Sequence, residues 1–534
     1  MATTSLEACD DSYLRHDAMR PIIPYSPTLF SPPTIRLAAN AKLDRSAFTK
    51  TINLAAAAVR DPRLLAQWRK KLDKNKELLT EAKVSGIQIL PERDLPTVVD
   101  LLREAHQKEQ DTIEDEGKKK DFVEPKPWSL KCLLLRPGVK ADEQSTFGPT
   151  LKEGLESKVL LKVVPFDLHL DYLHWEWNDI VTSILPPELH VEIPHGYNSV
   201  GHVAHLNLRE HHLPYRHLIG QILLDKGGST IRTVINKTDE IGESSEFRTF
   251  TYEVLAGEDD LDVEVAKMGC LFKFNYGKTY WNSKLDGEHR RLVDMFKPGE
   301  VVVDVMAGIG PFSVPAARQR CLVWANDYNP DSVEYMRDAI KTNKVGYTLR
   351  PFNQDGRLFI PWTAKDVLRA SKQEKEVTIP GKKPFRGSSK RPTPDTVIPI
   401  PPTISHFVMN LPASAPEFLG SFRGLYHGQE GLFAPHTEAK LPLLHVHCFA
   451  TKQQYAATTL KDSDMPYKEI LPRFSKQLGH EMKFGRKEGM RPDQFKDVKE
   501  LEDDEMAVWD VREVSPKKSM YCVSFRLPAD VAFA

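Results

Sequence analysis

The chain of 534 residues is 40% apolar, which is enough for about two to four domains with buried cores. Its 73 lysines and arginines balance 74 aspartates and glutamates, so a polycationic nucleic-acid binder is excluded and any RNA binding must come from local patches. No apolar run has membrane-spanning length, so we expect no membrane association. The six cysteines are scattered without a C-x-x-C pair, which favours reduced thiols over disulfides or a zinc site.

Residues 1–190 are predicted to form a small α/β region behind an irregular lead-in. Prolines crowd about the first 45 residues, where they oppose regular structure. The elements expected after this lead-in are basic-faced helices at 44–83, a helix at 94–106, strands at 129–137 and 158–177, and a short helix at 179–185.

Residues 191–284 are predicted to form a strand-rich middle domain. Apolar and polar residues alternate from Val200 to Leu208, as in a half-buried strand, while residues 215–224 fit a helix or a strand. Further strands are expected at 233–241, 247–257 and 269–285.

Five histidines of this domain raise a metal hypothesis: His202, His205, His211, His212 and His217. No cysteine accompanies them, so packing or surface roles are favoured. We therefore predict no metal site.

The stretch from Val301 to Pro330 is predicted to be a strand, a glycine turn, a helix and a second strand. Val301–Val303 form a β-branched run typical of a strand buried on both faces, and Asp304 ends it. Gly308 and Gly310 then supply a turn without Cβ atoms, where backbone N–H groups can approach a ligand at the carboxyl edge of the sheet.

The second strand, at residues 321–325, ends near Asp327, whose carboxylate can accept both hydroxyls of a ribose. A nicotinamide site would need a third glycine where this chain has Ser313. The Asp-x-x-x-Gly-x-Gly pattern instead resembles the S-adenosylmethionine site of Rossmann-like methyltransferases. The residues predicted to bind this cofactor are Asp304, Gly308, Gly310 and Asp327, with a purely structural turn as the alternative.

Residues 285–534 are therefore expected to form a Rossmann-like methyltransferase domain in an α/β protein whose preceding domains are smaller. The elements expected after the glycine turn are helices at 315–320 and 332–343, strands at 347–352, 406–410 and 441–450, and a closing hairpin at 508–528. Segment 371–403 is rich in lysine, proline and serine, so we predict a solvated, disordered insertion.

Two further strand ends of this domain carry candidate ligand-binding residues. Asp355 and Gly356 are positioned to bound the adenine of the cofactor. Asn410-Leu411-Pro412 resembles the Asn-Pro-Pro-aromatic turn with which amino methyltransferases hold a ring nitrogen, but Ala413 replaces the aromatic residue. This departure favours attack by a ring nitrogen over methylation of an exocyclic amine. The alternative is that Asn410 only caps a turn.

Glu288 lies at the start of a predicted helix just before the cofactor strand. Acidic residues are favourable at that position for dipole reasons alone, so a capping role is one interpretation. The other makes Glu288 a general base, because desolvation against a planar base in a closed pocket would raise the pKa of its carboxyl group.

Six ordered blocks between about Ile193 and Phe418 closely resemble the eukaryotic and archaeal tRNA (guanine-37-N1)-methyltransferases. The blocks are NSVGHVAHLNLREHHLPYRHLIGQILLDK, FRTFTYEVLAG, YWNSKLDGEHRRL, VVVDVMAGIGPFSVP with ANDYNPDSVEYM, NQDGRLFI, and FVMNLPASAPEFL. The resemblance implies transfer of a methyl group from S-adenosylmethionine to N1 of guanine 37 in tRNA, next to the anticodon, which supports reading-frame maintenance.

Carried over residue by residue, the resemblance makes Arg248 the guanine-binding arginine, Glu288 the general base and Asn410 a guanine contact. N1 of guanine carries a proton whose removal drives negative charge onto O6, so a base and a cation are both needed. The implied cofactor contacts are His289, Asp327, Tyr328, Asp355, Gly356 and Asn410, and Pro412 belongs to the same turn. Lys284 stands where many members have an arginine, so a guanidinium fork is missing there.

The family also implies that residues 1–190 bind the tRNA elbow and that the protein is a monomer found in the cytoplasm, the nucleus and the mitochondrial matrix. Two other functions stay open at this point. One is an aminocarboxypropyl transferase of wybutosine synthesis, which shares the Asn-Leu-Pro turn. The other is a non-catalytic RNA-binding protein with a retained cofactor fold.

Overall fold

The computed structural model describes residues 29–81, 83–111, 120–190, 193, 196–238, 250–381, 393–451, 467–485, 497–515 and 518–534. The chain divides into two compact units, the first made of residues 1–196 and 208–228 and the second of residues 197–207 and 229–534.

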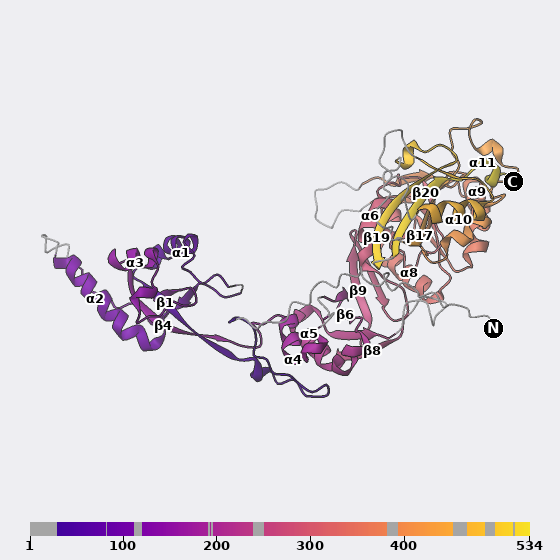
Figure 1. The fold of residues 1–534 in the computed structure, drawn as a ribbon. Coiled ribbons are helices and arrows are strands. Elements are labelled where there is room, and N and C mark those ends of the chain that lie inside the picture. Colours follow the sequence, from indigo (N-terminus) through magenta and orange to yellow (C-terminus); the bar gives the residue numbers. More distant parts are fainter. Residues whose placement is uncertain are drawn as a thin grey trace, which may run out of the picture. The chain divides into compact units, whose positions relative to one another are not determined.

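The first unit is built on a four-stranded antiparallel sheet with the strand order β2-β3-β1-β4 (Figure 1). Its strands are β1 (Lys50–Val59), β2 (Ile87–Ile89), β3 (Lys131–Leu134) and β4 (Leu160–Leu170). Its helices are α1 (Leu65–Lys74), α2 (Leu95–Asp111), α3 (Pro149–Glu156), α4 (Trp177–Ile184) and α5 (Arg216–Lys226). Residues 215–224, which fitted a helix or a strand, therefore belong to a helix.

Strand β1 corrects the prediction of helices throughout residues 44–83. Its run of alanines has a high helix propensity, which explains the wrong prediction. In the structure β1 pairs with β3 on one side and β4 on the other, and Ala56 and Ala57 are fully buried. Pairing and burial in the centre of a sheet outweigh local propensity here.

The second unit begins with two small sheets. The four-stranded sheet has the order β5-β6-β7-β8, and β9 pairs with β10 in a separate antiparallel hairpin. The strands are β5 (Asn198–Val200), β6 (Val203–Leu206), β7 (Thr233–Lys237), β8 (Tyr252–Gly257), β9 (Asp262–Lys267) and β10 (Cys270–Asn275). All four residues of β6 are buried, so this strand is not the half-buried one that the alternation predicted.

An eight-stranded sheet forms the centre of the second unit, with the order β13-β12-β11-β16-β17-β20-β19-β18. The strands are β11 (Val301–Asp304), β12 (Leu322–Asn326), β13 (Leu349–Phe352), β16 (His406–Met409), β17 (Leu443–Thr451), β18 (Lys483–Phe484), β19 (Glu505–Ser515) and β20 (Lys518–Arg526). Strands β13, β12, β11, β16 and β17 run parallel, and β20 is antiparallel to β17 and β19. The predicted Rossmann-like fold and its closing hairpin are confirmed.

The order of the strands creates a topological switch point. The chain passes outward from β11 to β12 and β13 and then returns to β16 on the other side of β11. Ligands of open α/β sheets bind at the carboxyl ends of the strands at such a point.

Helices cover both faces of this sheet: α6 (Asp286–Val293), α7 (Ser313–Arg318), α8 (Pro330–Asn343), α9 (Gly356–Gln373), α10 (Tyr467–Leu478) and α11 (Ala529–Ala532). The valines of β11 alternate between the two cores, because Val301 and Val303 belong to one apolar cluster and Val302 to the other. The prediction of a strand buried on both faces is thereby confirmed. Among the described helices, none has the length and apolar character needed to cross a membrane.

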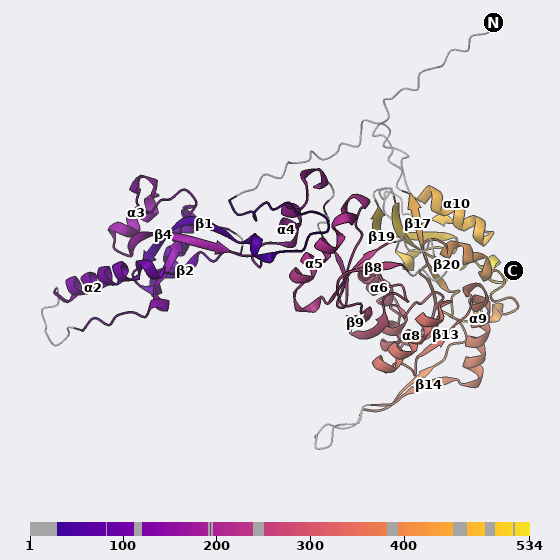
Figure 2. The ribbon, with the colours of Figure 1, turned by 90° about the horizontal axis from the view of Figure 1, so that it is seen from below.

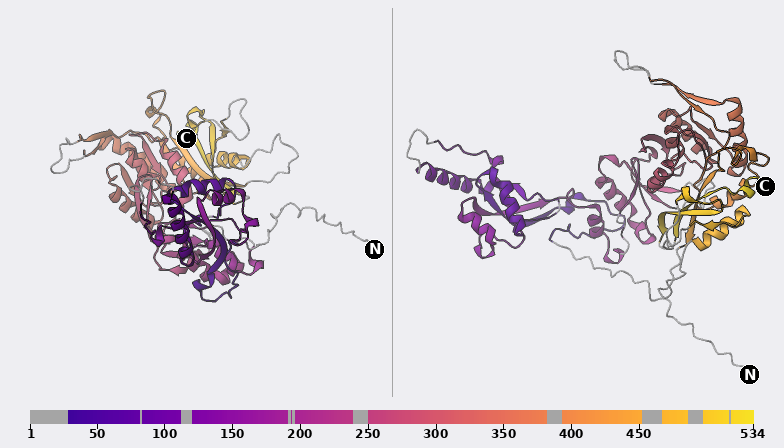
Figure 3. Two further views of the ribbon diagram at one scale, coloured as in Figure 1. Left: turned by 90° about the vertical axis from the view of Figure 1, so that its left-hand side faces the viewer. Right: turned by 90° about the horizontal axis from the view of Figure 1, so that it is seen from above.

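Segment 371–403 differs from the predicted disordered insertion in its described part. Strands β14 (Glu376–Ile379) and β15 (Thr396–Pro399) pair antiparallel at the end of α9, as Figures 2 and 3 show. Ile398 and Ile400 are buried in the core next to α9. These two isoleucines lie in a proline-rich background, which hid the apolar anchor in the sequence.

Candidate active site

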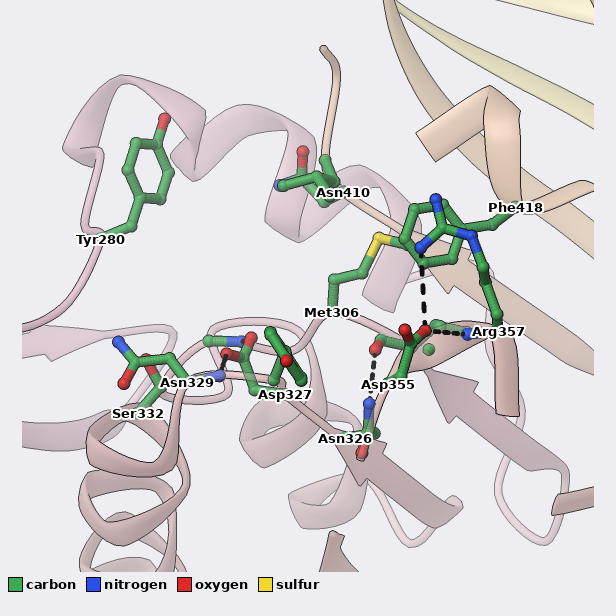
Figure 4. A pocket seen from close by; sticks show the side chains of 15 residues that line it. Tyr280, Met306, Asn326, Asp327, Asn329, Ser332, Asp355, Arg357, Asn410 and Phe418 are labelled. Carbon is green, nitrogen blue, oxygen red and sulfur yellow. Dashed lines mark hydrogen bonds and ion pairs between the residues drawn. The ribbon is translucent and has the colours of Figure 1, made fainter. Parts of the chain in front are cut away.

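A cavity of about 350 Å³ opens at the carboxyl ends of β13, β12, β11 and β16, at the switch point of the sheet (Figure 4). Figure 4 shows Tyr280 and Asn410 on one side of this cavity and Asp327, Asn329 and Ser332 on the other. The complete lining is Tyr280, Val305, Met306, Gly308, Asn326, Asp327, Tyr328, Asn329, Ser332, Asp355, Gly356, Arg357, Asn410, Leu411 and Phe418.

The carboxylate of Asp327 is fixed by backbone donors. Its Oδ2 accepts the N–H of Gly308 at 2.7 Å, and its Oδ1 accepts the N–H of Asn329 at 2.9 Å. Gly308 has a φ of 58°, which explains why a glycine stands there. Burial raises the pKa of Asp327, although the two N–H groups oppose this shift. Each carboxylate oxygen keeps a second lone pair for a ligand hydroxyl.

Asn326 joins the ends of three neighbouring strands. Its Nδ2 donates to the carbonyl oxygens of Val305 and Gln354, each at 3.0 Å. Its Oδ1 accepts the N–H of Gln354 at 2.9 Å. The loops that follow β11, β12 and β13 are therefore held together by one buried amide.

The wall next to β13 is formed by the start of α9. Asp355 caps this helix by accepting the N–H of Arg357 at 2.8 Å. A Cβ added at Gly356 would lie 2.9 Å from Val305 Cγ1 and 3.1 Å from Phe418 Cε1, so a side chain does not fit there. The guanidinium of Arg357 lies over the ring of Phe418, 4.1 Å from its centroid, as a cation–π pair.

Asn410 follows β16 and forms the opposite wall. Its Oδ1 is buried and has no hydrogen-bond partner within the described chain. A buried amide oxygen without a partner is costly, so its position on the wall points to a donor supplied by a ligand. Pro412 lies outside the lining, and its carbonyl oxygen accepts the N–H of Phe449 at 3.0 Å.

Asp304 lies beneath the cavity rather than on its wall, in contrast to the prediction of a cofactor contact. It is fully buried, and its Oδ2 accepts the hydroxyl of Ser313 at 2.6 Å. Burial raises the pKa of Asp304 to about 7, the hydroxyl of Ser313 lowers it, and the charge of Asp327 adds to the rise. Asp304 therefore supports the glycine turn from below.

Glu288 also lies outside the cavity lining. Its side chain is buried, and Arg291 donates to both carboxylate oxygens, at 2.7 Å from Nε and 2.8 Å from Nη2. His447 Nε2 lies 2.8 Å from Glu288 Oε1. Burial would raise the pKa of Glu288, but Arg291 and His447 outweigh it and lower the pKa to about 2. The predicted raised pKa is wrong, because the sequence did not reveal the two donors.

Three other predicted residues have positions that the sequence did not specify. Gly310 lies off the wall, and its φ of 93° and a Cβ approach of 3.0 Å to Val314 give it a packing role. His289 is buried against Phe312, with ring centroids 4.5 Å apart, and burial lowers its pKa to about 4. Arg248 lies outside the described residues.

The histidines of the metal hypothesis and the described cysteines lie in the core or form local hydrogen bonds. His205 Nδ1 is 3.1 Å from the hydroxyl of Tyr276, and His202 Nε2 is 3.0 Å from the carbonyl oxygen of Asp260. In the described ranges, the one cluster with metal-ligand geometry is Glu288, His447 and Cys522, to which none of the five predicted histidines belongs. The described cysteines, Cys132, Cys270, Cys321, Cys448 and Cys522, are free and buried, as predicted.

Sequence comparison shows what the chain is related to. Residues 177–260 match the TYW2 N-terminal domain, and residues 263–371 match the TRM5/TYW2 methyltransferase domain. The tRNA (guanine(37)-N(1))-methyltransferase of Neurospora crassa is 50% identical over 507 residues, which cover 95% of each chain. The chain belongs to the tRNA (guanine(37)-N(1))-methyltransferase family. This membership confirms the resemblance found in the sequence.

The chain is also similar to another curated member and to a solved structure. The family member from Fusarium vanettenii is 48% identical over 509 residues, covering 95% of this chain and 97% of its own. The crystal structure of wild-type Trm5b from Pyrococcus abyssi is 19% identical, covers 89% of this chain and 99% of its own, and has a TM-score of 0.49.

Several wall residues were missed by sequence reasoning: Tyr280, Val305, Met306, Asn326, Asn329, Ser332, Arg357, Leu411 and Phe418. Most of them lie next to a predicted strand end. Their closeness in sequence to Gly308, Asp327, Asp355 or Asn410 was the signal that could have identified them. Phe418 had no such signal, because a separate 3-10 helix, Ala415–Phe422, brings it to the cavity.

Asp304→Asn is expected to remove a pH dependence of stability. The pKa of Asp304 in the folded chain, about 7, lies above the ordinary value of 3.8, so the wild type loses stability as the pH rises between these values. The asparagine stays neutral, so the melting temperature of the variant minus that of the wild type should grow from about pH 5 to about pH 8. A thermal-melting series measures this difference, and a level difference would contradict the raised pKa.

Proposed function

We propose that this chain transfers a methyl group from S-adenosylmethionine to N1 of guanine 37 in tRNA. The proposal rests on family membership and on one observation: a carboxylate, Asp327, fixed by two backbone N–H groups on the wall of a cavity at the switch point. That carboxylate offers acceptors for the two ribose hydroxyls of the cofactor.

The other wall residues fit the same cofactor. Met306 and Phe418 supply apolar surface for an adenine ring, and Gly356 leaves space that a side chain would fill. The unpartnered Oδ1 of Asn410 can accept a hydrogen bond from an ammonium or an amino group. When bound, S-adenosylmethionine supplies an electrophilic methyl group on a sulfonium.

The base for the N1 proton is proposed to be Glu288. Each carboxylate has about four lone-pair sites, and Arg291 and His447 occupy three of those on Glu288, so one site on Oε2 is left for an N–H donor. A carboxylate with a pKa of about 2 is a weak base. N1–H becomes more acidic as N1 bonds to carbon, so the proton passes to Glu288 while the N–C bond forms, and negative charge develops on O6 in the same step.

The family resemblance implies that Arg248 stabilises the negative charge that develops on guanine O6. Asn410 lies at the end of β16 and can contact both cofactor and guanine from one turn. Tyr280 on the same side of the cavity offers a ring on which a flipped base can stack. These roles are part of the proposal.

Family resemblance also supports three further proposals about context. The partner is tRNA, whose elbow is bound by residues within 1–190, and the protein acts as a monomer. It works in the cytoplasm, the nucleus and the mitochondrial matrix.

Glu288→Gln should abolish turnover while leaving cofactor affinity nearly unchanged. The amide cannot take up the N1 proton, so single-turnover methylation of a purified tRNA should fall by about 100-fold or more, while the dissociation constant for S-adenosylmethionine changes by less than about twofold. Glu374→Gln is the matched control, because Glu374 is also paired with an arginine, Arg350, but away from the cavity.

Mass mapping of the nucleoside made by the wild type tests the reaction itself. The expected product is guanosine with one methyl group on N1 at position 37. An aminocarboxypropyl adduct, or an unmodified tRNA in the presence of bound cofactor, would overturn the proposed function.

Gly356→Ala should weaken binding of S-adenosylmethionine by about tenfold, with a loss of stability of about 1–3 kcal/mol from the displaced side chains. The added Cβ would displace Val305 and Phe418, which both line the cavity. Calorimetric titration measures the affinity. Gly431→Ala is the control, because no atom lies within 4 Å of a Cβ built at Gly431. Equal affinities for the two variants would place the cofactor elsewhere.

A further inference from the structure

His447 links the helix that carries Glu288 to the strand end that carries Asn410. Its ring is fully buried on β17, with Nε2 2.8 Å from Glu288 Oε1 and Nδ1 3.4 Å from the carbonyl oxygen of Met409. Met409 is the last residue of β16 and directly precedes Asn410. The imidazole therefore contacts Glu288 directly, and it contacts Met409, the residue directly before Asn410.

Among the described hydrogen bonds of Glu288, only the one to His447 reaches another element. Arg291 lies three residues after Glu288 on the same helix, so its fork holds the carboxylate to α6 alone. The guanidinium of Arg291 also lies 5.0 Å from the ring centroid of Trp509. Without His447, the carboxylate would keep no direct hydrogen bond to the sheet among the described residues.

Both ring nitrogens of His447 face oxygen acceptors, at 2.8 and 3.4 Å, an arrangement that favours a proton on each. A doubly protonated, buried imidazole is stable only beside a negative group, and Glu288 supplies that charge. Burial alone would lower the pKa of His447, but Cys522 and the carboxylate of Glu288 outweigh it and raise the pKa to about 10. The pair is thus an imidazolium and a carboxylate at neutral pH.

We propose that His447 is a positioning residue for the methyl transfer, which fixes the Glu288 carboxylate relative to the Asn410 turn. This inference rests on the proposed function and adds a residue to it. His447 is fully buried and, like Glu288, is absent from the cavity lining, so its hydrogen bond to Glu288 is the route by which it acts.

Other titratable groups face this pair from the elements packed around it. They are His289 and Arg291 on α6, Asp304 on β11, His445 on β17 and Cys522 on β20. The positive charge of Arg291 lowers the pKa of Glu288 as His447 does, so loss of His447 shifts that pKa upward without removing all stabilisation.

His445 is the matched control on the same strand. It is also fully buried, but its Nε2 lies 3.0 Å from His406 Nδ1 and its Nδ1 lies 2.8 Å from Ser524 Oγ. Burial lowers the pKa of His445 well below the ordinary value, so this ring is neutral. The two imidazoles differ in charge and in partner, although they share strand and burial.

His447→Gln should shift the acid limb of the pH profile of kcat/KM to higher pH. The glutamine amide still donates to Glu288 but carries no charge, so the pKa of Glu288 rises and the carboxylate is protonated at a higher pH. We expect activity on tRNA to fall on acidification at least about one pH unit earlier than in the wild type, and kcat to fall by about tenfold with KM nearly unchanged. His445→Gln should keep the wild-type acid limb even if it is less stable. An unshifted limb and unchanged kcat in a folded His447→Gln variant would overturn the inference.

A second measurement needs no variant of His447. Nitrogen-15 spectra of the full chain labelled at histidine should contain one imidazolium that persists above about pH 8 and disappears in Glu288→Gln. Spectra with only neutral imidazoles at that pH would overturn the inference. This spectrum does not depend on activity. Failure of the proposed function would instead appear as a wild type that does not methylate guanine, so the two failures can be told apart.

Discussion

The carboxylate of Asp327 joins the turn after β11 to the turn after β12, and the rest of the site is arranged around it. Gly308 donates to one oxygen and Asn329 to the other, so the glycine turn cannot move without displacing the acidic group. A buried carboxylate needs such donors, because burial disfavours its charge. The same two bonds that stabilise the charge also aim the free lone pairs toward a ligand.

The sequence was sufficient for most of the methyltransferase fold because its strands carry local signals. The valine run at Val301–Val303, the glycine turn and the apolar strand before Asp327 each have a pattern with one physical explanation. The first unit was harder. The alanines of β1 favour a helix locally, and only the pairing of β1 with β3 and β4, which comes from distant parts of the chain, makes a strand.

Site residues that directly follow a strand end could be predicted from the sequence. Site residues that a distant element brings to the cavity were missed. Asp327, Asp355 and Asn410 are of the first kind, and Phe418 is of the second. The charge state of Glu288 could not be derived from its neighbours in sequence alone. Arg291 lies three residues away, but His447 comes 159 positions later and reaches Glu288 only because β17 lies beside the strand that ends at Met409.

The buried amide of Asn326 has a consequence for how the cavity can adapt. Because one side chain holds the loops after three consecutive strands, those loops form a single rigid half-shell that cannot open piece by piece. Any closure around a ligand must then come from the opposite wall, where Asn410 has an unsatisfied oxygen. Ligand binding in this enzyme is therefore asymmetric, because one wall of the cavity is preformed and the other adjusts.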